Sequence, residues 1–186
     1  EVACGVGAVN GPYGVLLRAN PNVSPTRIGL TQYSVASNLW TKRGGDVSIA
    51  VPTSASPCCI NPDLAIADEN GVLVWTGKAA DGYYRAYVVR FKLSIVGVQL
   101  LDPVPVELPG TIRESVAISV VEAGCADPSS GCVSGTEFYV ARQTGGQALP
   151  GQLPNVTQEV NFYKFDFGSG AFTSLANYSD KNVNGK

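Results

Sequence analysis

The sequence predicts an all-β fold: a single antiparallel β-sandwich or jelly-roll-like domain with little helix. Apolar and polar residues alternate over many short runs, as on a strand with one buried face. Gly (21) and Pro (12) are frequent among the 186 residues, and turn-forming residues interrupt the runs about every ten positions. The apolar spacing of three and four that marks a helix does not persist anywhere for about ten residues. A β-trefoil or a β-prism is the next alternative.

Two runs are expected to be the central strands. Residues 83–96 form the longest β-like run, in which Val89 and Phe91 share one parity and Arg90 has the other. Residues 111–121 alternate in the same way. Since successive side chains on a strand point to opposite faces, both strands are predicted to have one buried and one wetter face.

The remaining predicted strands are residues 13–18, 27–35, 46–51, 63–67, 72–76, 136–142, 158–167 and 171–176. Residues 158–167 carry apolar side chains of both parities, which predicts a strand covered on both faces.

Turn residues and the chain ends complete the predicted organisation. Residues 68–71 form a hairpin turn in which Asn70-Gly71 can take positive φ angles. Residues 1–12 are predicted to be an extended N-terminal arm or edge segment. Residues 13–176 form the domain, and residues 177–186 a polar tail.

Composition restricts the class of partner. The chain is 45% apolar and 15% charged, with a net charge of −2 and no basic block. This argues against nucleic acid and against an electrostatically held membrane surface. No apolar run approaches the length of a membrane span, so no membrane insertion is expected. The chain lacks Met and begins Glu1-Val2-Ala3, which fits a mature, secreted, extracellular protein, although a shortened chain would read the same.

The cysteines favour disulfides over metal. Cys125 and Cys132 close a short loop of turn-forming residues, as a hairpin-end disulfide does. Cys4 is expected to bond to Cys58 or Cys59, and the fifth thiol is then either buried or bonded to another chain. The chain has no His, and no two Cys have the spacing of a zinc knuckle, so neither a metal nor any other cofactor is expected.

Three sequons are present, at Asn22, Asn155 and Asn177. They predict N-glycosylation in a secreted chain, whereas chance would supply one or two of them. Pro25 weakens the first sequon, and Asn155 is the best placed.

The absence of His excludes Ser-His-Asp and Cys-His catalysis. A carboxylate pair such as Glu114 and Glu122 remains, although such side chains more often cap strand ends. Aromatic rings offer a binding surface instead, because sugars stack on them. Trp75 and Tyr84 are the candidate ligand-binding residues, Tyr84 because it has the parity of the wetter face.

Two short stretches resemble known families. Residues 64–76 resemble one repeat of the bulb-type mannose lectins, a strand and an Asp-containing turn followed by a strand ending in Trp75. Those proteins have three such repeats and a Gln-Asp-Asn-Tyr sugar motif, neither of which is present here. Residues 96–102 resemble a strand of chaperone–usher fimbrial subunits, and residues 138–151 resemble the stretch that follows this strand there. The resemblance implies an incomplete sandwich that a neighbour's N-terminal arm completes, and residues 2–12 are a candidate for such an arm.

These features predict a secreted structural or adhesive protein without enzymatic activity. It would self-associate through its N-terminal arm as a building block of an extracellular filament, pilus or coat. The alternative is a carbohydrate-binding, lectin-like module with a glycan ligand. A glycoside-acting enzyme with paired carboxylates comes third.

Overall fold

A computed structural model describes residues 4–10, 13–20, 27–36, 39–50, 60–78, 84–108, 115–122, 135–144 and 158–180. Within these residues the protein is all-β, with 82% of them in strands and no helix. The described residues therefore include no helix that is long and apolar enough to cross a membrane. The predicted all-β, sandwich-like fold class is confirmed.

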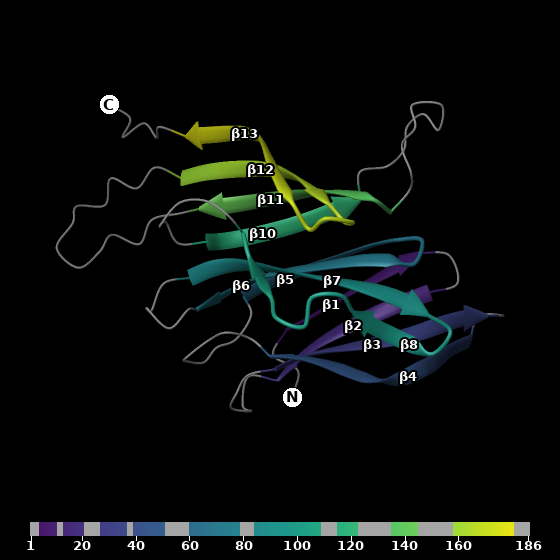
Figure 1. The fold of residues 1–186 in the computed structure, drawn as a ribbon. Helices are drawn as coiled ribbons and strands as arrows, with labels where there is room; N and C mark the ends of the chain where they lie inside the picture. The colour runs from purple at the N-terminus through teal and green to yellow at the C-terminus, as the bar shows by residue number, and fades with distance from the viewer. Residues whose placement is uncertain are drawn as a thin grey trace, which may run out of the picture.

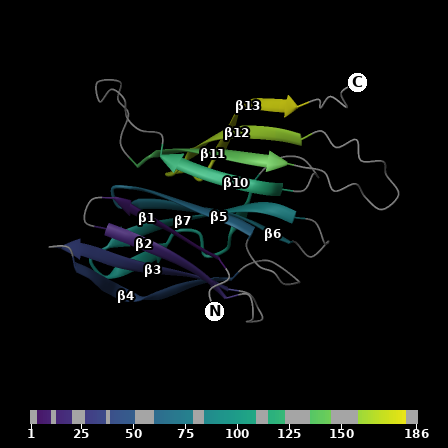
Figure 2. The ribbon, with the colours of Figure 1, turned by 180° about the vertical axis from the view of Figure 1, so that it is seen from behind.

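The strands form three antiparallel sheets, which follow one another along the chain and are stacked in layers (Figures 1 and 2). The N-terminal sheet comprises β1 (Cys4–Asn10), β2 (Tyr13–Asn20), β3 (Arg27–Ala36) and β4 (Leu39–Ala50). The middle sheet comprises β5 (Ile60–Ala67), β6 (Asn70–Lys78), β7 (Tyr84–Ser94) and β8 (Gly97–Leu100), and β9 (Val106–Glu107) also pairs with β7. The C-terminal sheet comprises β10 (Ser115–Glu122), β11 (Glu137–Thr144), β12 (Gln158–Asp166) and β13 (Phe172–Asp180).

The middle sheet is buried on both faces. The side chains on one face of this sheet, such as Leu73 and Val89, pack on the N-terminal sheet and form a first core cluster. The side chains on the other face, such as Val74 and Val88, pack on the C-terminal sheet and form a second cluster. The core is therefore divided into two layers that share one sheet.

This layering corrects two predictions. β7 was expected to have one wetter face, but Ala86 and Val88 on that face are buried against the C-terminal sheet. Among the described side chains of this parity, those from Arg90 onward are partly exposed. Conversely, residues 158–167 were expected to be covered on both faces, yet Phe162 on β12 is 41% exposed because no described layer lies outside the C-terminal sheet.

The structure describes part of each chain end. Within residues 1–12, β1 pairs with β2 from Cys4↔Ala19 to Asn10↔Tyr13, so this segment is an edge strand of the chain's own sheet. At the other end β13 continues to Asp180, past the predicted strand end at residue 176.

The turn between β5 and β6 is formed by Asp68 and Glu69. Asp68 takes a positive φ of 51°, which was expected of Asn70-Gly71.

Two glycines have packing roles that the sequence does not reveal. Gly71 lies within β6, where a Cβ atom would come within 2.1 Å of the Phe91 ring. Gly44 lies inside β4, where a Cβ atom would be 2.1 Å from the Val96 carbonyl oxygen.

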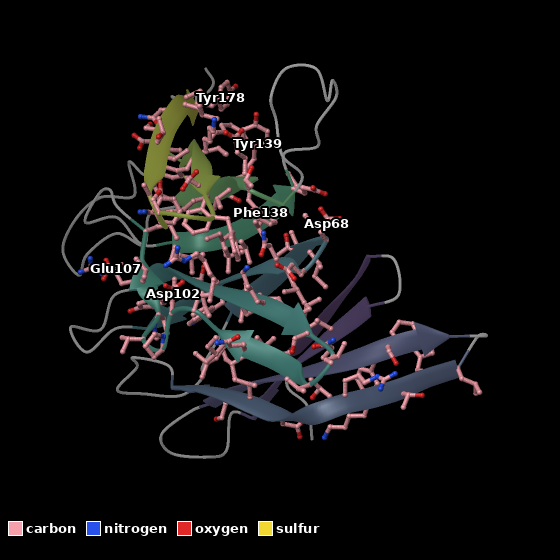
Figure 3. All side chains as sticks on the ribbon, turned by 45° about the vertical axis from the view of Figure 1, so that its right-hand side comes forward. Asp68, Asp102, Glu107, Phe138, Tyr139 and Tyr178 are labelled. Atoms are coloured by element: carbon pink, nitrogen blue, oxygen red, sulfur yellow. The ribbon has the colours of Figure 1, made fainter. Side chains whose placement is uncertain are left out.

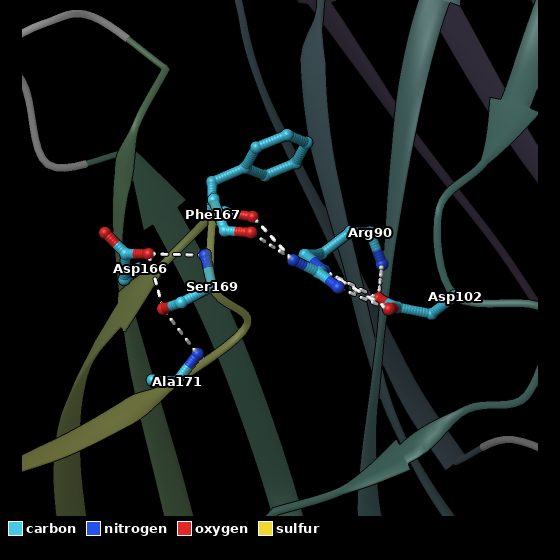
Figure 4. Close-up of polar contacts among 7 residues, drawn as sticks. Arg90, Asp102, Asp166, Phe167, Ser169 and Ala171 are labelled. Atoms are coloured by element: carbon cyan, nitrogen blue, oxygen red, sulfur yellow. Dashed lines mark hydrogen bonds and ion pairs between the residues drawn. The ribbon is translucent and has the colours of Figure 1, made fainter.

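Arg90 joins the middle sheet to the C-terminal sheet (Figure 4). Its guanidinium binds the Asp102 carboxylate, with the shortest contact 2.7 Å from Nη2 to Oδ1, and its backbone N–H donates to the same carboxylate. Nη1 donates to the carbonyl oxygens of Phe167 (2.8 Å) and Gly168 (3.0 Å) in the β12–β13 turn. A hydrogen bond from the Ser169 backbone N–H to Asp166 braces that turn. Arg90 therefore fixes this turn over the middle sheet.

The ion pair is largely removed from water, since the side chains of Arg90 and Asp102 are 16% and 10% exposed. Burial by itself would raise the pKa of the Asp102 carboxyl, but the hydrogen bonds and charge of Arg90 hold that pKa below its ordinary value. Because the folded pKa is depressed, Asp102 stabilises the fold above its unfolded pKa, and this contribution is lost as the pH falls through the folded value.

Other hydrogen bonds also hold the layers together. Asp63 on β5 accepts from the Ser119 hydroxyl (2.5 Å) and the Val120 backbone N–H (2.9 Å) on β10. The Asn70 side chain donates to the Gly135 carbonyl, next to β11. Gln32 on β3 donates to the Ser94 carbonyl at the end of β7. Each link joins a strand of one sheet to a neighbouring layer and so fixes how the layers are aligned.

We expect the substitution Asp102→Asn to lower the free energy of unfolding by about 3 kcal/mol at neutral pH, because it leaves a buried guanidinium without its counter-charge. As the pH falls below about 4, the carboxyl of unfolded Asp102 protonates first and that of the folded protein at lower pH, so the difference between the two proteins should shrink. Urea denaturation across this pH range measures both effects. Glu107→Gln is the control, because the Glu107 side chain is 48% exposed in its pair with Arg85, and it should cost at most about 1 kcal/mol. Equal losses for the two variants would contradict the structural role of the Arg90–Asp102 pair.

Candidate functional site

The structure does not bring the predicted ligand-binding residues together on a surface. Trp75 on β6 has no exposed surface and faces the N-terminal sheet. Its ring stacks on Tyr87, with centroids 5.7 Å apart and planes at 27°. Tyr84 begins β7 opposite Lys78, but its side chain lies outside the described part of the molecule. The Trp75 ring is therefore a core group that a ligand could reach only if two layers separated.

Most predicted covalent sites fall outside the described residues. This applies to Cys58, Cys59, Cys125 and Cys132, and also to Asn22 and Asn155. Cys4 lies at the start of β1, where only its backbone is described. Asn177 is exposed on the last strand, β13, so the third sequon is open to solvent. The disulfide and glycosylation assignments remain predictions.

The structure describes only one member of the expected carboxylate pair of Glu114 and Glu122. Glu122 accepts a hydrogen bond from the Gly135 backbone N–H at 3.3 Å, which is a role at a strand end. Glu114 lies outside the described residues. Within the described ranges no three acidic, Cys or His side chains are grouped so as to hold a metal ion.

Polar side chains also gather at one end of the space between the middle and C-terminal sheets. Arg142 is 4% exposed on β11, and burial lowers the pKa of its guanidinium, while nearby Tyr163 and Glu107 act in the opposite direction. Thr144 on β11 and Asn161 on β12 are buried on the same face of the C-terminal sheet. Because these side chains face the middle sheet, we assign the group to the packing of the two layers.

Surface aromatic rings occur instead on the two outer sheets. On the N-terminal sheet the Trp40 side chain is 55% exposed. It contacts the Tyr33 ring edge-on, with centroids 6.2 Å apart and planes at 73°. Trp40 lies over Gly14 of β2, where an added Cβ atom would be 2.2 Å from Cζ3 of the indole. We call Gly14, Tyr33 and Trp40 the Trp40 platform.

The C-terminal sheet has a second surface of this kind, which we call the outer aromatic face. Register pairs place its residues on one side: Val121 is opposite Tyr139, and Tyr178 is opposite Val160, two residues from Phe162. The exposed fractions are 55% for Val121, 43% for Tyr139, 41% for Phe162 and 64% for Tyr178. Figure 3 shows Tyr139 and Tyr178 farther from the middle sheet than Phe138, which is buried.

Sequence reasoning missed both surfaces. Parity does separate Phe138 from Tyr139, but it cannot tell which of the two faces another layer covers. The strand predicted in this region covered residues 46–51 only, whereas β4 begins at Leu39 and ends at Ala50. Trp40 is therefore part of the strand and lies in register with Val35. Only the strand pairing shows that its ring can lie across β3 to reach Gly14.

No protein-family model matches the chain, and no curated protein matches it either. The candidate surfaces therefore rest on their own geometry.

The two tryptophans should differ in fluorescence, because Trp75 is buried and Trp40 is half exposed. We expect iodide to quench only part of the wild-type emission. Trp40→Phe should remove the quenched, red-shifted part and leave a blue-shifted emission that iodide barely affects. A Stern–Volmer titration measures this difference. Strong quenching in Trp40→Phe would contradict the buried position of Trp75.

Proposed function

We propose that the protein is a non-enzymatic, secreted structural or adhesive domain, and that copies of it assemble into a larger extracellular structure. The observation that carries the proposal is the outer aromatic face of Val121, Tyr139, Phe162 and Tyr178, exposed on the C-terminal sheet. The occupant we assign to this face is a second copy of the chain.

The outer aromatic face has the properties of a protein contact. It is a sheet surface on which large apolar side chains are neighbours on adjacent strands, whereas solitary exposed apolar residues need no explanation. Aromatic residues are enriched at the centres of protein interfaces, where they supply most of the binding energy. Burial of these side chains against an apolar surface would therefore be favourable.

A second copy fits this face for two reasons. A two-fold interface requires a patch that is complementary to itself, and an apolar sheet face meets this requirement. The charged residues beside it include both signs, as the ion pair between Lys164 and Glu137 shows. With a net charge of −2, two copies would repel each other only weakly.

The pairing of β1 argues against assembly through an N-terminal arm. Residues 4–10 are engaged with β2 of the same chain, so they would have to leave it before joining a neighbour. A single two-fold contact closes a dimer, and a filament needs a second contact. The edge strand β1 and the fifth cysteine are the proposed sources of that second contact.

We expect the wild-type protein to associate as its concentration rises, and the double variant Tyr139→Ser with Phe162→Ser to remain monomeric. Loss of two interface aromatics should weaken association by about tenfold or more. Light scattering over a concentration series, with and without reductant, gives the mass. The control is Ile95→Ser in the β7–β8 turn, which removes an 84% exposed apolar side chain far from this face in sequence. A wild-type protein that stays monomeric in both conditions would refute the assembly role.

Secretion makes a separate prediction at Asn177, which is exposed on β13. When the chain is expressed through a eukaryotic secretory pathway, Asn177→Gln should lower the mass of the product by one N-glycan. Intact mass spectrometry before and after enzymatic deglycosylation measures this change. Asn22→Gln is a matched control for a sequon that Pro25 weakens. An identical mass before and after deglycosylation would contradict glycosylation at any of the three sequons.

A further inference from the structure

We propose that the outer edge of β13 pairs with β13 of a second copy, antiparallel and about a two-fold axis, so that two C-terminal sheets join into one continuous sheet. This inference rests on the proposed assembly function. It adds a source of the second contact that any structure larger than a dimer needs, besides β1 and the fifth cysteine. The outer aromatic face supplies side chains for the first contact, whereas β13 supplies backbone groups, so one copy can make both contacts at once.

β13 is the last strand of its sheet, and one of its two edges is open. The described strands follow the order β10-β11-β12-β13, so β12 pairs with one edge and no described strand pairs with the other. β13 also lies at the end of the stack that is farthest from the N-terminal sheet (Figure 1). The side chains of residues 173–178 are all exposed. This edge therefore offers backbone N–H and C=O groups to an added strand.

The sequence of β13 contains few of the features that keep edge strands from pairing. Such features are Pro, charged residues, a bulge, a short strand or a covering segment. β13 has nine residues without Pro, Lys or Arg, and its one acidic residue, Asp180, is the last. It does have one irregularity at Leu175, where the register with β12 shifts. Residues 176–180 follow this shift as an uninterrupted stretch for pairing.

The other edges of the described sheets are protected in one or more of these ways. On β10, the Val120 backbone N–H donates to Asp63 of β5. β5 contains Pro62 and a register shift, and β1 lies close beside it. β4 carries charged residues of both signs, and β8 and β9 have only four and two residues. β13 differs from these strands as a long edge without charge before its last residue.

Residues 176–180 can pair with themselves around Tyr178. When Tyr178 lies opposite Tyr178 of the other copy, each Asp180 lies opposite Ala176, so like charges do not meet. The Tyr178 side chain belongs to the outer aromatic face and is 64% exposed, and this pairing gives it an aromatic neighbour on the adjacent strand. An unrelated extended chain offers the same backbone groups but not this match of side chains. We therefore assign the edge to a second copy.

The sequon at Asn177 is compatible with this pairing. Asn177 is the Cα partner of Asn161, which is buried toward the middle sheet, so Asn177 lies on the side of β13 opposite to Tyr178. Side chains leave a strand from its faces and not along its edge. A glycan at Asn177 would therefore point away from the outer aromatic face and would not occupy the backbone edge.

Edge pairing follows the contact between outer aromatic faces. A short pair of strands is marginally stable in water by itself, so single copies do not pair through β13 alone. A dimer held by the outer aromatic face presents two β13 edges, and linked sites bind more strongly than single ones. The wild-type protein should therefore grow beyond dimers, while a variant that lacks the face contact remains monomeric.

The test compares a like-charge variant, Asn177→Lys with Ser179→Lys, and an opposite-charge variant, Asn177→Lys with Ser179→Glu. In the proposed register, residue 177 lies opposite residue 179 of the other copy. The like-charge variant thus places Lys opposite Lys, and the opposite-charge variant places Lys opposite Glu. Both variants change the same two positions, remove the sequon and leave the outer aromatic face intact.

We expect the wild-type protein and the opposite-charge variant to grow beyond dimers as the concentration rises, and the like-charge variant to stop at dimers. The step beyond dimers should be weakened by about tenfold or more. Sedimentation velocity over a concentration series measures this step. Two added lysines bring the net charge of −2 closer to neutrality, so overall repulsion would not explain a loss of association.

Thermal unfolding of both variants separates loss of pairing from loss of folding. A folded like-charge variant that grows beyond dimers as readily as the opposite-charge variant would overturn the edge pairing, and so would a wild-type protein that stops at dimers. Either result leaves assembly through the outer aromatic face in place. A wild-type protein that stays monomeric refutes the assembly role itself, so the two failures are distinguishable.

Discussion

The burial of the middle sheet on both faces is the constraint on which the rest of this structure depends. Its strands have no solvent side along most of their length, so Val72, Leu73, Val74 and Trp75 are consecutive and fully buried. Polar side chains within this sheet, such as Arg90 on β7 and Asp63 on β5, are accommodated by hydrogen bonds to partners in the sheet or in the next layer. The two outer sheets can each keep one face for water, because the middle sheet supplies the apolar surface against which both of them pack.

Because apolar contact is not directional, it does not determine how three stacked sheets are turned relative to each other. The polar links at the edges of the layers supply that information. Arg90 binds Asp102 within its own layer and two carbonyl oxygens in the next one, and Asp63 joins β5 to β10. Such groups are costly to bury unless they are fully paired, so a shifted arrangement that broke these pairs would be strongly disfavoured.

Alternation and turn residues were sufficient to predict an all-β fold and the positions of most strands. They were not sufficient for the layering, for a physical reason. Parity tells which residues share a face, but not what covers that face. On β7 the small apolar Ala86 and Val88 were outweighed by Arg90 and Lys92, which lie farther along the strand, so a doubly buried strand was interpreted as an amphipathic one. On β12 the reverse error placed Phe162 in the core.

The same limitation explains why Trp75 was chosen as a ligand candidate and Trp40 was not. Trp75 and Trp40 both lie in strands, and only the stacking order buries the first and exposes the second. Trp75 lies in the core, where it fills the space between two sheets. Trp40 lies on the surface, where its ring contacts Gly14 and Tyr33. Whether an aromatic residue of this fold is buried therefore depends on which neighbouring sheet faces its strand, and the parity of the residue carries no information on that point.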